Sequence, residues 1–179
     1  MKKITAFFIM LATAGALQAQ TNTGDWMVGG TFKINTSKEN TQIGFTPSAG
    51  TFVVNNLAIG VNLLFDYSKI GDNKETDFGI GPFVRYYFTE ADIRPVFHGN
   101  LSFLSSRTKT PDESVTNSGL NFFLGAGAAI FISEHVSIDI LMGYDHTKLK
   151  GFDGSGGFAL HAGFQVYLHK SQVDKVRGR

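Results

Sequence analysis

The stretch that decides the fold is GFALHAGFQVYL, residues 157–168. Apolar side chains occupy every second position, and small or polar side chains occupy the positions between them. The apolar set is Phe158, Leu160, Ala162, Phe164, Val166 and Leu168, and the other set includes His161, Gln165 and Tyr167. A repeat of two residues predicts a β-strand with two different faces, because an α-helix repeats about every 3.6 residues.

The same alternation recurs along the chain and predicts about eight strands. We place them at residues 25–35, 41–53, 57–68, 76–88, 93–104, 118–132, 136–147 and 155–168. Each run is long enough to cross a bilayer at a tilt, which takes about 9–11 residues. No charged residue falls on the apolar phase of these runs. We therefore predict an all-β protein, an eight-stranded antiparallel up-and-down transmembrane β-barrel.

The composition excludes several other classes. Charged residues make up only 17% of the chain, against roughly 25% in an ordinary soluble domain. A net charge of +1 offers no basic field, so we expect no nucleic-acid partner. The absence of cysteine excludes a disulfide framework. After residue 20, no apolar run approaches the ~18 residues of a membrane helix.

The first residues have the pattern of a secretory signal peptide. Lys2 and Lys3 precede a short apolar run, and small residues follow at the expected cleavage zone. Cleavage after Ala16 or after Ala19 fits, and we favour Ala19. The predicted domain organisation is a signal peptide at residues 1–19, an outer-membrane barrel at residues 20–170, and a periplasmic tail at residues 171–179.

The predicted connections alternate in length. The short ones are Asn55–Asn56, Thr89–Asp92 and Ser133–His135, and the longer, polar ones are Thr36–Asn40, Lys69–Glu75, Ser105–Asn117 and Lys148–Gly154. Short turns on one side and long loops on the other predict periplasmic turns and termini, with extracellular loops. The Ser105–Asn117 loop is the longest and is the predicted contact surface. Pro47 and Pro82 each remove a ladder hydrogen bond, so we expect a bulge beside each.

The inward phase carries charges of both signs. The predicted lumen network is Lys33, Asp66, Asp77, Arg85, His98, Asn121, Asp139 and His161, with Arg94, Asn100, Asp145 and Gln165 on the same phase. An eight-stranded barrel is just wide enough for side chains, so we predict a plugged lumen. The alternative is a narrow ion path lined by the same groups. Inward glycines then make room for large side chains such as Phe83 and Phe123.

Aromatic residues gather near the predicted strand ends. The predicted girdle is Trp26, Phe32, Phe45, Tyr67, Phe78, Phe88, Phe103, Tyr144 and Phe158. Amphipathic rings at these positions anchor a barrel at the two headgroup layers. Basic residues of the third and fourth loops, Arg107, Lys109, Lys148 and Lys150, lie where they would meet lipopolysaccharide, although solvated loop charges are the simpler interpretation.

Two segments carry a family resemblance. Residues 47–60, PSAGTFVVNNLAIG, resemble the strand–turn–strand of the outer membrane protein β-barrel domain family of Gram-negative bacteria, and residues 156–168 resemble its closing strand. The resemblance implies residence in the outer membrane, contact with its lipids and insertion by the barrel assembly machinery. The tail after Leu168 departs from the aromatic terminus that this machinery reads in the family.

Two further function classes stay open at this stage. The first is a secreted lipocalin-like barrel that binds a small apolar ligand, which requires apolar residues inside. The second is a lipid-modifying enzyme, with Asp139 beside His161 as an acid–base pair, or a rim set of Ser155, His146 and Asp153. Ser, His and Asp are common in loops, so their presence there is weak evidence for a catalytic site. We therefore predict no enzymatic activity. We also expect no cofactor and no metal, because the five histidines lack metal-ligand spacing.

Overall fold

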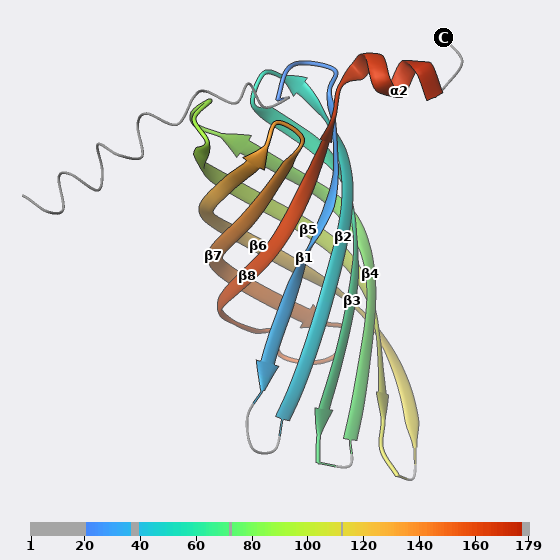
Figure 1. Cartoon of the computed structure of the whole chain (residues 1–179). Helices are drawn as coiled ribbons and strands as arrows, with labels where there is room; N and C mark the ends of the chain where they lie inside the picture. The colour runs from blue at the N-terminus through green and yellow to red at the C-terminus, as the bar shows by residue number, and fades with distance from the viewer. Residues whose placement is uncertain (1–20, 37–39, 72, 112, 177–179) are drawn as a thin grey trace, which may run out of the picture.

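The protein forms a closed barrel of eight strands with a short C-terminal helix. The computed structural model describes residues 21–36, 40–71, 73–111 and 113–176. The elements are β1 (Trp26–Thr36), β2 (Asn40–Val54), β3 (Leu57–Ile70), β4 (Asn73–Tyr87), β5 (Ile93–Lys109), β6 (Ser114–Ser133), β7 (Val136–Leu149), β8 (Ser155–Leu168) and α2 (Lys170–Val176). Each strand pairs antiparallel with the next, and β8 pairs with β1 (Figure 1). The predicted strand number, antiparallel order and closure are confirmed.

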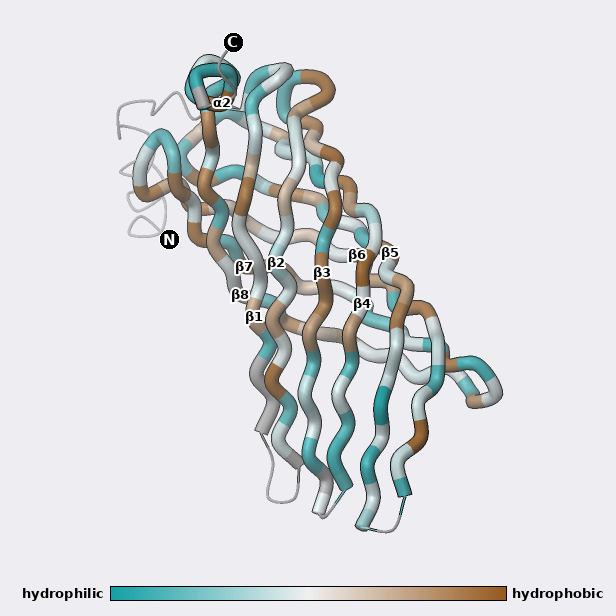
Figure 2. The backbone as a smooth tube through the Cα atoms, turned by 90° about the vertical axis from the view of Figure 1, so that its right-hand side faces the viewer, coloured by the Kyte–Doolittle hydropathy of each residue, from teal (hydrophilic) through white to brown (hydrophobic). Residues whose placement is uncertain are grey.

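Apolar side chains cover the outer wall. Phe164 is 43% exposed and Ile138 is 45% exposed, whereas Asp139 on the inner face is fully buried. Figure 2 shows hydrophobic residues along the middle of the strands and hydrophilic residues toward the hairpin ends, which are at the bottom of the view. An apolar surface of this extent needs a lipid environment. The distribution contradicts the lipocalin-like alternative, which requires the charged groups outside.

The short turns lie at the end of the barrel that holds both described chain ends. Asn55 and Asn56 join β2 to β3, and Asn56 has a positive φ of 65°. Asparagine tolerates this left-handed conformation, which a tight hairpin turn requires. Because the strand number is even, Thr21 and helix α2 lie at this same rim (Figure 1).

The strands at the opposite end are longer than the sequence predicts. Residues 105–117, expected as a long loop, are mostly strand, because β5 runs to Lys109 and β6 begins at Ser114. Residues 69–70 and 73–75 likewise continue β3 and β4, with Lys69 paired to Lys74. The hydrophobic alternation stops where the apolar belt ends, but the backbone ladder continues beyond it. The predicted contact loop is therefore a projecting β-hairpin (Figure 1).

The two strand prolines do not cause bulges. Pro47 stays in register with Gly30 of β1, and Pro82 stays in register with Val61 of β3. The ladder omits pairs only on the other side of each proline, without a shift in register. In an antiparallel ladder the N–H of a residue points to one neighbour only, so a proline weakens one side. The observed register shifts lie instead beside short turns, at Phe52/Val54 and Phe131/Ser133.

The predicted signal peptide lies outside the described residues. Helix α2 occupies most of the segment predicted as a tail. No helix within the described ranges is long and apolar enough to cross a membrane.

Candidate functional site in the barrel lumen

A first polar cluster lies in the half of the lumen nearer the long hairpins. We call this half the upper lumen, although Figure 1 draws the hairpins at the bottom. Asp145 of β7 accepts a hydrogen bond from Asn121 Nδ2 at 2.6 Å, and its other carboxylate oxygen lies 3.5 Å from Lys33 Nζ. The same oxygen lies 3.7 Å from His161 Nε2. Strands β1, β6, β7 and β8 each supply one group, so the carboxylate holds four strands together. We call Lys33, Asn121, Asp145 and His161 the mouth cluster.

An open vestibule lies on the hairpin side of the mouth cluster. It has a volume of about 720 Å³ and is lined by Lys33, Glu75, Asp77, Asp145 and Ser155, among others. Ser106 Oγ donates to Glu75 Oε1 at 3.0 Å on its wall.

An aromatic layer crosses the lumen beneath the mouth cluster. The Phe123 ring stacks on the His161 ring at 4.3 Å, and the His98 ring lies between Phe83 and Phe123 at 5.6 and 6.2 Å. The remaining hollow at this level measures about 30 Å³. That space suffices for about one water molecule. The rings of the aromatic layer therefore fill most of the lumen at this level.

A second polar cluster lies below the aromatic layer and is fully buried. Arg85 Nη2 of β4 lies 2.8 Å from Asp139 Oδ2 of β7, and both side chains are at most 1% exposed. Ser137 Oγ donates to the other carboxylate oxygen of Asp139 at 2.8 Å. Tyr167 and Tyr87 extend this chain of hydroxyl groups, with 2.9 Å between successive oxygens. We call these five residues the lower cluster.

The direction of the hydroxyl chain follows from counting protons. Each hydroxyl carries one donor hydrogen. Ser137 uses its hydrogen for Asp139, so Tyr167 must donate to Ser137, and Tyr87 must donate to Tyr167. The chain therefore ends on the Asp139 side chain, which accepts from Ser137 and lies beside Arg85.

Arg94 closes the lumen at the rim with the short turns. Its guanidinium lies 4.4 Å from the centre of the Phe131 ring and donates to Thr21 Oγ1 at 2.9 Å. It also donates to the carbonyl oxygens of Glu90 and Ala91. One cation thus ties the first described residues to the β4–β5 turn and covers the base of the lumen.

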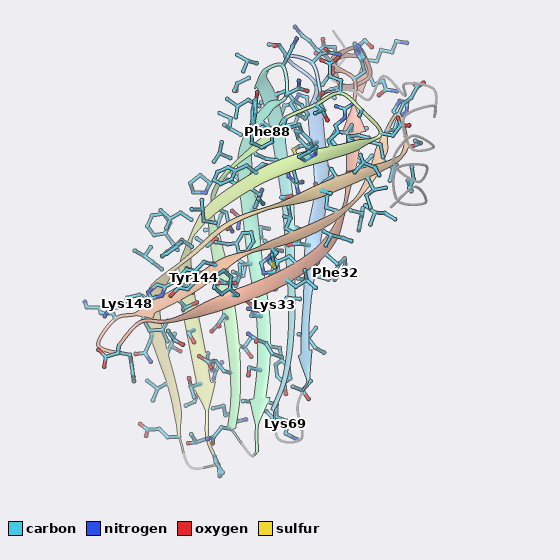
Figure 3. The ribbon with its side chains drawn as sticks, turned by 90° about the vertical axis from the view of Figure 1, so that its left-hand side faces the viewer. Phe32, Lys33, Lys69, Phe88, Tyr144 and Lys148 are labelled. Atoms are coloured by element: carbon cyan, nitrogen blue, oxygen red, sulfur yellow. The ribbon has the colours of Figure 1, made fainter. Side chains whose placement is uncertain are left out.

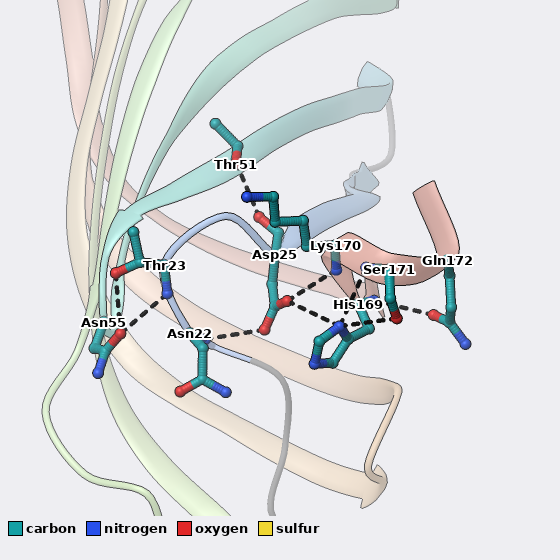
Figure 4. Close-up of polar contacts among 9 residues, drawn as sticks. All are labelled: Asn22, Thr23, Asp25, Thr51, Asn55, His169, Lys170, Ser171 and Gln172. Atoms are coloured by element: carbon teal, nitrogen blue, oxygen red, sulfur yellow. Dashed lines mark hydrogen bonds and ion pairs between the residues drawn. The ribbon is translucent and has the colours of Figure 1, made fainter. Parts of the chain in front are cut away.

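The N-terminal segment and helix α2 fasten to each other at this rim (Figure 4). The buried Asp25 carboxylate accepts hydrogen bonds from the backbone N–H groups of Asn22 and Lys170 at 3.1 and 3.0 Å. His169 Nδ1 lies 3.8 Å from the same carboxylate. Asn55 of the first short turn accepts from the Thr23 N–H at 3.0 Å. These contacts hold both described chain ends against the barrel wall.

The structure places all eight predicted lumen residues inside the barrel, but it joins them in ways the sequence does not indicate. Asp66 lines the small hollow beside the mouth cluster. Asp77 Oδ1 and His98 Nδ1 are buried without a hydrogen-bond partner among the described residues. The hydroxyls of Ser137, Tyr87 and Tyr167 also join the network, which the sequence does not predict. Their inward phase was the available signal.

The acid–base interpretations fail on geometry. Asp139 contacts Arg85 and Ser137, and His161 lies beside Asp145, so the predicted Asp139–His161 pair does not form. The His146 ring lies on the outer wall, 5.4 Å from Phe122, whereas Ser155 lines the vestibule. Among the described residues, no group of three or more metal-ligating side chains could hold a metal ion.

The predicted aromatic girdle lies on the outer wall. Trp26 is half-buried, and the others are exposed: Phe32, Phe45, Tyr67, Phe78, Phe88, Phe103, Tyr144 and Phe158. Figure 3 shows Phe88 near the rim with the termini, and Phe32 and Tyr144 well away from it. The Phe32 and Phe45 rings stack at 4.6 Å across β1 and β2, and Phe65 meets Phe78 at 5.2 Å across β3 and β4. Such cross-strand pairs stabilise the sheet as well as suiting a headgroup layer.

Solved structures share this fold. Neisserial surface protein A matches with a TM-score of 0.65 and 16% identity, over 80% of this chain and 97% of that one. The N-terminal β-barrel domain of Pseudomonas aeruginosa OprF matches with a TM-score of 0.53 and 13% identity, over 82% and 98% of the two chains. Ail, the attachment invasion locus protein of Yersinia pestis, matches with a TM-score of 0.53 and 12% identity, over 82% and 99%. At these identities the likeness concerns the fold alone.

Sequence comparison assigns the family. No curated protein matches the chain. Residues 4–171 match the family described as outer membrane protein beta-barrel domain. That match covers nearly the whole sequence, and the closed eight-stranded barrel with an apolar outer wall agrees with it. The chain belongs to the outer membrane protein β-barrel domain family.

Proposed function

We propose that this protein is an outer-membrane anchor with a closed lumen, which presents its long hairpins outside the cell. The observation that carries the proposal is the filled lumen. From the mouth cluster to Arg94, side chains from facing strands occupy the interior, and the aromatic layer leaves about 30 Å³. Such a barrel would serve to hold its projecting hairpins at the membrane surface.

The alternative of an ion path requires continuous water through the barrel. Below the aromatic layer, Arg85, Tyr87, Tyr167 and Phe52 are almost fully buried. Arg85 and Asp139 neutralise each other, so the lower cluster offers a permeating ion no net charge. Burial and charge balance both favour a plug.

The proposed orientation rests on the asymmetry of the two rims. The short turns share one rim with both described chain ends, and the hairpins of β3 to β6 project from the other. Outer-membrane barrels have short periplasmic turns and longer extracellular connections. We therefore assign Thr110 at the β5–β6 turn to the cell exterior and Glu134 at the β6–β7 turn to the periplasm. The projecting hairpin is the proposed contact surface.

Cysteine labelling tests this orientation. The chain contains no cysteine, so a single introduced thiol is the only site in this protein that a maleimide can label. On intact cells, a membrane-impermeant maleimide is expected to label Thr110→Cys at least tenfold more than Glu134→Cys. Both variants should label equally after lysis. The control is heat-dependent migration of each variant from the membrane fraction, since a folded barrel resists unfolding until it is boiled. Stronger labelling of Glu134→Cys on intact cells would reverse the assigned orientation.

Planar-bilayer recording tests the closed lumen. The folded protein is expected to give no steady conductance steps, because the aromatic layer and the lower cluster block a water column. An open porin added to the same bilayer serves as the control for detection. Frequent, long-lived steps that scale with the amount of folded protein would refute the plug and support the ion path.

A further inference from the structure

The seam between β1 and β8 is paired over only part of its length. The described pairs along it end at Phe32 and Ala162. Beyond this pair, residues 33–36 of β1 and residues 155–161 of β8 have no partner across the seam in the described part of the chain. We call the opening between these two stretches the seam gap. Figure 1 shows β1 and β8 side by side near α2 and apart toward the hairpins.

Backbone groups of β8 point into the seam gap. The Phe164 carbonyl oxygen lies against Gly29 of β1, so the ladder groups of Phe164 point across the seam. Successive residues of an antiparallel strand direct their N–H and C=O groups alternately to the two neighbouring strands. Phe158 and Leu160 are in phase with Phe164, so their N–H and C=O groups point across the seam where β1 has no paired residue. An unpaired edge of this kind is a template for another strand.

The vestibule opens sideways through the seam gap. Its lining includes Lys33 of β1 and residues 155–160 of β8, which border the gap from its two sides. Phe158 and Leu160 lie on the outward phase and are 87% and 65% exposed. On the inward phase, Gly157 has nothing within 4 Å of an added Cβ. A strand in the seam gap would therefore have one face toward the vestibule and the other toward the surroundings of the barrel.

The vestibule carries an excess of negative charge. Four carboxylates line it, those of Glu75, Asp77, Asp145 and Asp153, whereas Lys33 is the one basic side chain in its described lining. Lys33 Nζ lies 3.5 Å from Asp145 Oδ2, which offsets one carboxylate. The other three form no ion pair among the described residues. Basic side chains on the inward face of an added strand would complement this charge.

The outer side of the seam gap is apolar. Phe158 and Leu160 flank it on β8, and the exposed ring of Phe32 stands at its closed end on β1. Because side chains alternate along a strand, a peptide that fits the gap carries basic residues at every second position and apolar residues between them. The free stretch of β1 has four residues and that of β8 has seven, so the fitting segment is about four to seven residues long.

We propose that the seam gap binds an extended peptide segment of alternating basic and apolar residues, which adds as a strand between β1 and β8. The free ladder groups favour a peptide over a cationic amphiphile, because an alkyl chain has no N–H and C=O groups to pair with a strand edge. The proposal rests on the orientation given above, so the segment belongs to a peptide or protein outside the cell.

Titration of a fluorescein-labelled heptapeptide of alternating lysine and valine tests the proposal. The folded protein is held in phosphatidylcholine nanodiscs, which leave both rims accessible and carry no net charge, and fluorescence anisotropy reports binding. The alternating peptide is expected to bind saturably. A peptide of the same composition with its lysines and valines in separate blocks should bind about tenfold more weakly, since it cannot match both faces at once. N-methylation of the valines, which removes backbone donors, should weaken binding by a similar factor.

Leu160→Pro and Leu160→Ala form a matched pair. Leu160→Pro removes an N–H group that points into the seam gap and is not used in the ladder with β7, so the barrel should fold and bind the peptide about tenfold more weakly. Leu160→Ala removes the side chain but keeps that N–H group, and should bind within about threefold of the unmodified chain. Heat-dependent gel migration checks folding. If Leu160→Pro does not fold, the N-methylated peptide makes the same test from the side of the ligand.

A second matched pair tests the charge of the vestibule. Glu75→Gln/Asp153→Asn removes two of its carboxylates and should weaken binding of the alternating peptide about fivefold. Glu134→Gln/Asp174→Asn makes the same change of charge at the opposite rim and should leave binding unchanged. Equal losses for the two double variants would contradict the vestibule as the site.

Further outcomes decide between the occupants. Equal binding of the alternating and block peptides, or equal binding to Leu160→Pro and Leu160→Ala, would overturn the proposal. Displacement of the peptide by dodecylammonium, together with insensitivity to Leu160→Pro, would overturn it in favour of a cationic amphiphile. Exterior labelling of Thr110→Cys together with a failure to bind the peptide would refute the peptide site alone and leave the proposed orientation standing.

Discussion

Asp139→Ala is expected to destabilise the folded barrel by about 3–5 kcal/mol, because it leaves the Arg85 cation buried without a partner. Arg85 and Asp139 are both almost fully buried, so water cannot replace the lost carboxylate. Ser137 also loses the acceptor of its hydrogen bond, which removes the end point of the hydroxyl chain. The measurement is the free energy of unfolding in urea, followed by the gel mobility of folded and unfolded protein in lipid vesicles.

Three further variants separate this effect from a general loss of packing. Arg85→Met/Asp139→Leu removes both charges and should recover most of the stability, since apolar replacement of a buried ion pair is often neutral. Tyr167→Phe removes only a neutral hydroxyl and should cost about 1 kcal/mol. Asp153→Ala, at an exposed position, should change stability by no more than about 0.5 kcal/mol. A loss for Asp139→Ala no larger than that of Asp153→Ala would contradict the role assigned to the lower cluster.

Gly60→Val is expected to destabilise the barrel by about 3 kcal/mol, the upper end of the usual cost of overpacking. Gly60 of β3 pairs with Gly50 of β2, and the Phe83 ring lies against both glycines. A Cβ atom at Gly60 would lie 2.5 Å from Gly50 Cα and 2.6 Å from Phe83 Cε1, and would also contact the Ala49 carbonyl oxygen. The same urea titration in lipid vesicles measures the change.

The chain offers a matched control on the inner face. Gly157 of β8 is exposed and has nothing within 4 Å of an added Cβ, so Gly157→Val should change stability by no more than about 0.5 kcal/mol. Adding Phe83→Leu to Gly60→Val should recover part of the loss, because the ring can be shortened but the Ala49 carbonyl cannot move away. Equal effects of Gly60→Val and Gly157→Val would show that Gly50 and Gly60 do not create the space for Phe83.

The sequence predicts the wall of the barrel well because a membrane requires apolar side chains on the lipid-facing side of every strand. The alternation through Phe158 and His161 identifies the two faces of β8, and the same repeat yields the strand number. Asn55–Asn56 marks a tight turn, because asparagine tolerates the backbone conformation that the turn requires. These features depend on local neighbours and on the polarity of the surroundings, and both can be inferred from the order of residues in the sequence.

The sequence predicts the strand ends poorly. Residues 105–109 and 114–117 extend β5 and β6 beyond the apolar belt, where the surroundings are polar on both faces. Without lipid on one side, the two faces of a strand need not differ, so the alternation disappears while the hydrogen-bond ladder continues. The same reasoning explains why the sequence predicts Arg107 and Lys109 to be loop charges, although both lie on β5.

The outward or inward side of each residue was determined by the sequence alone, and its partner was decided only by the tertiary structure. The sequence places Arg85, Asp139, Asp145 and His161 on the inner phase, but it does not indicate that Arg85 meets Asp139 or that His161 meets Asp145. Partners inside a barrel depend on how the strands tilt and stagger when the sheet closes, since closure brings distant strands across the lumen. The period of two assigns faces, and the closed geometry assigns contacts.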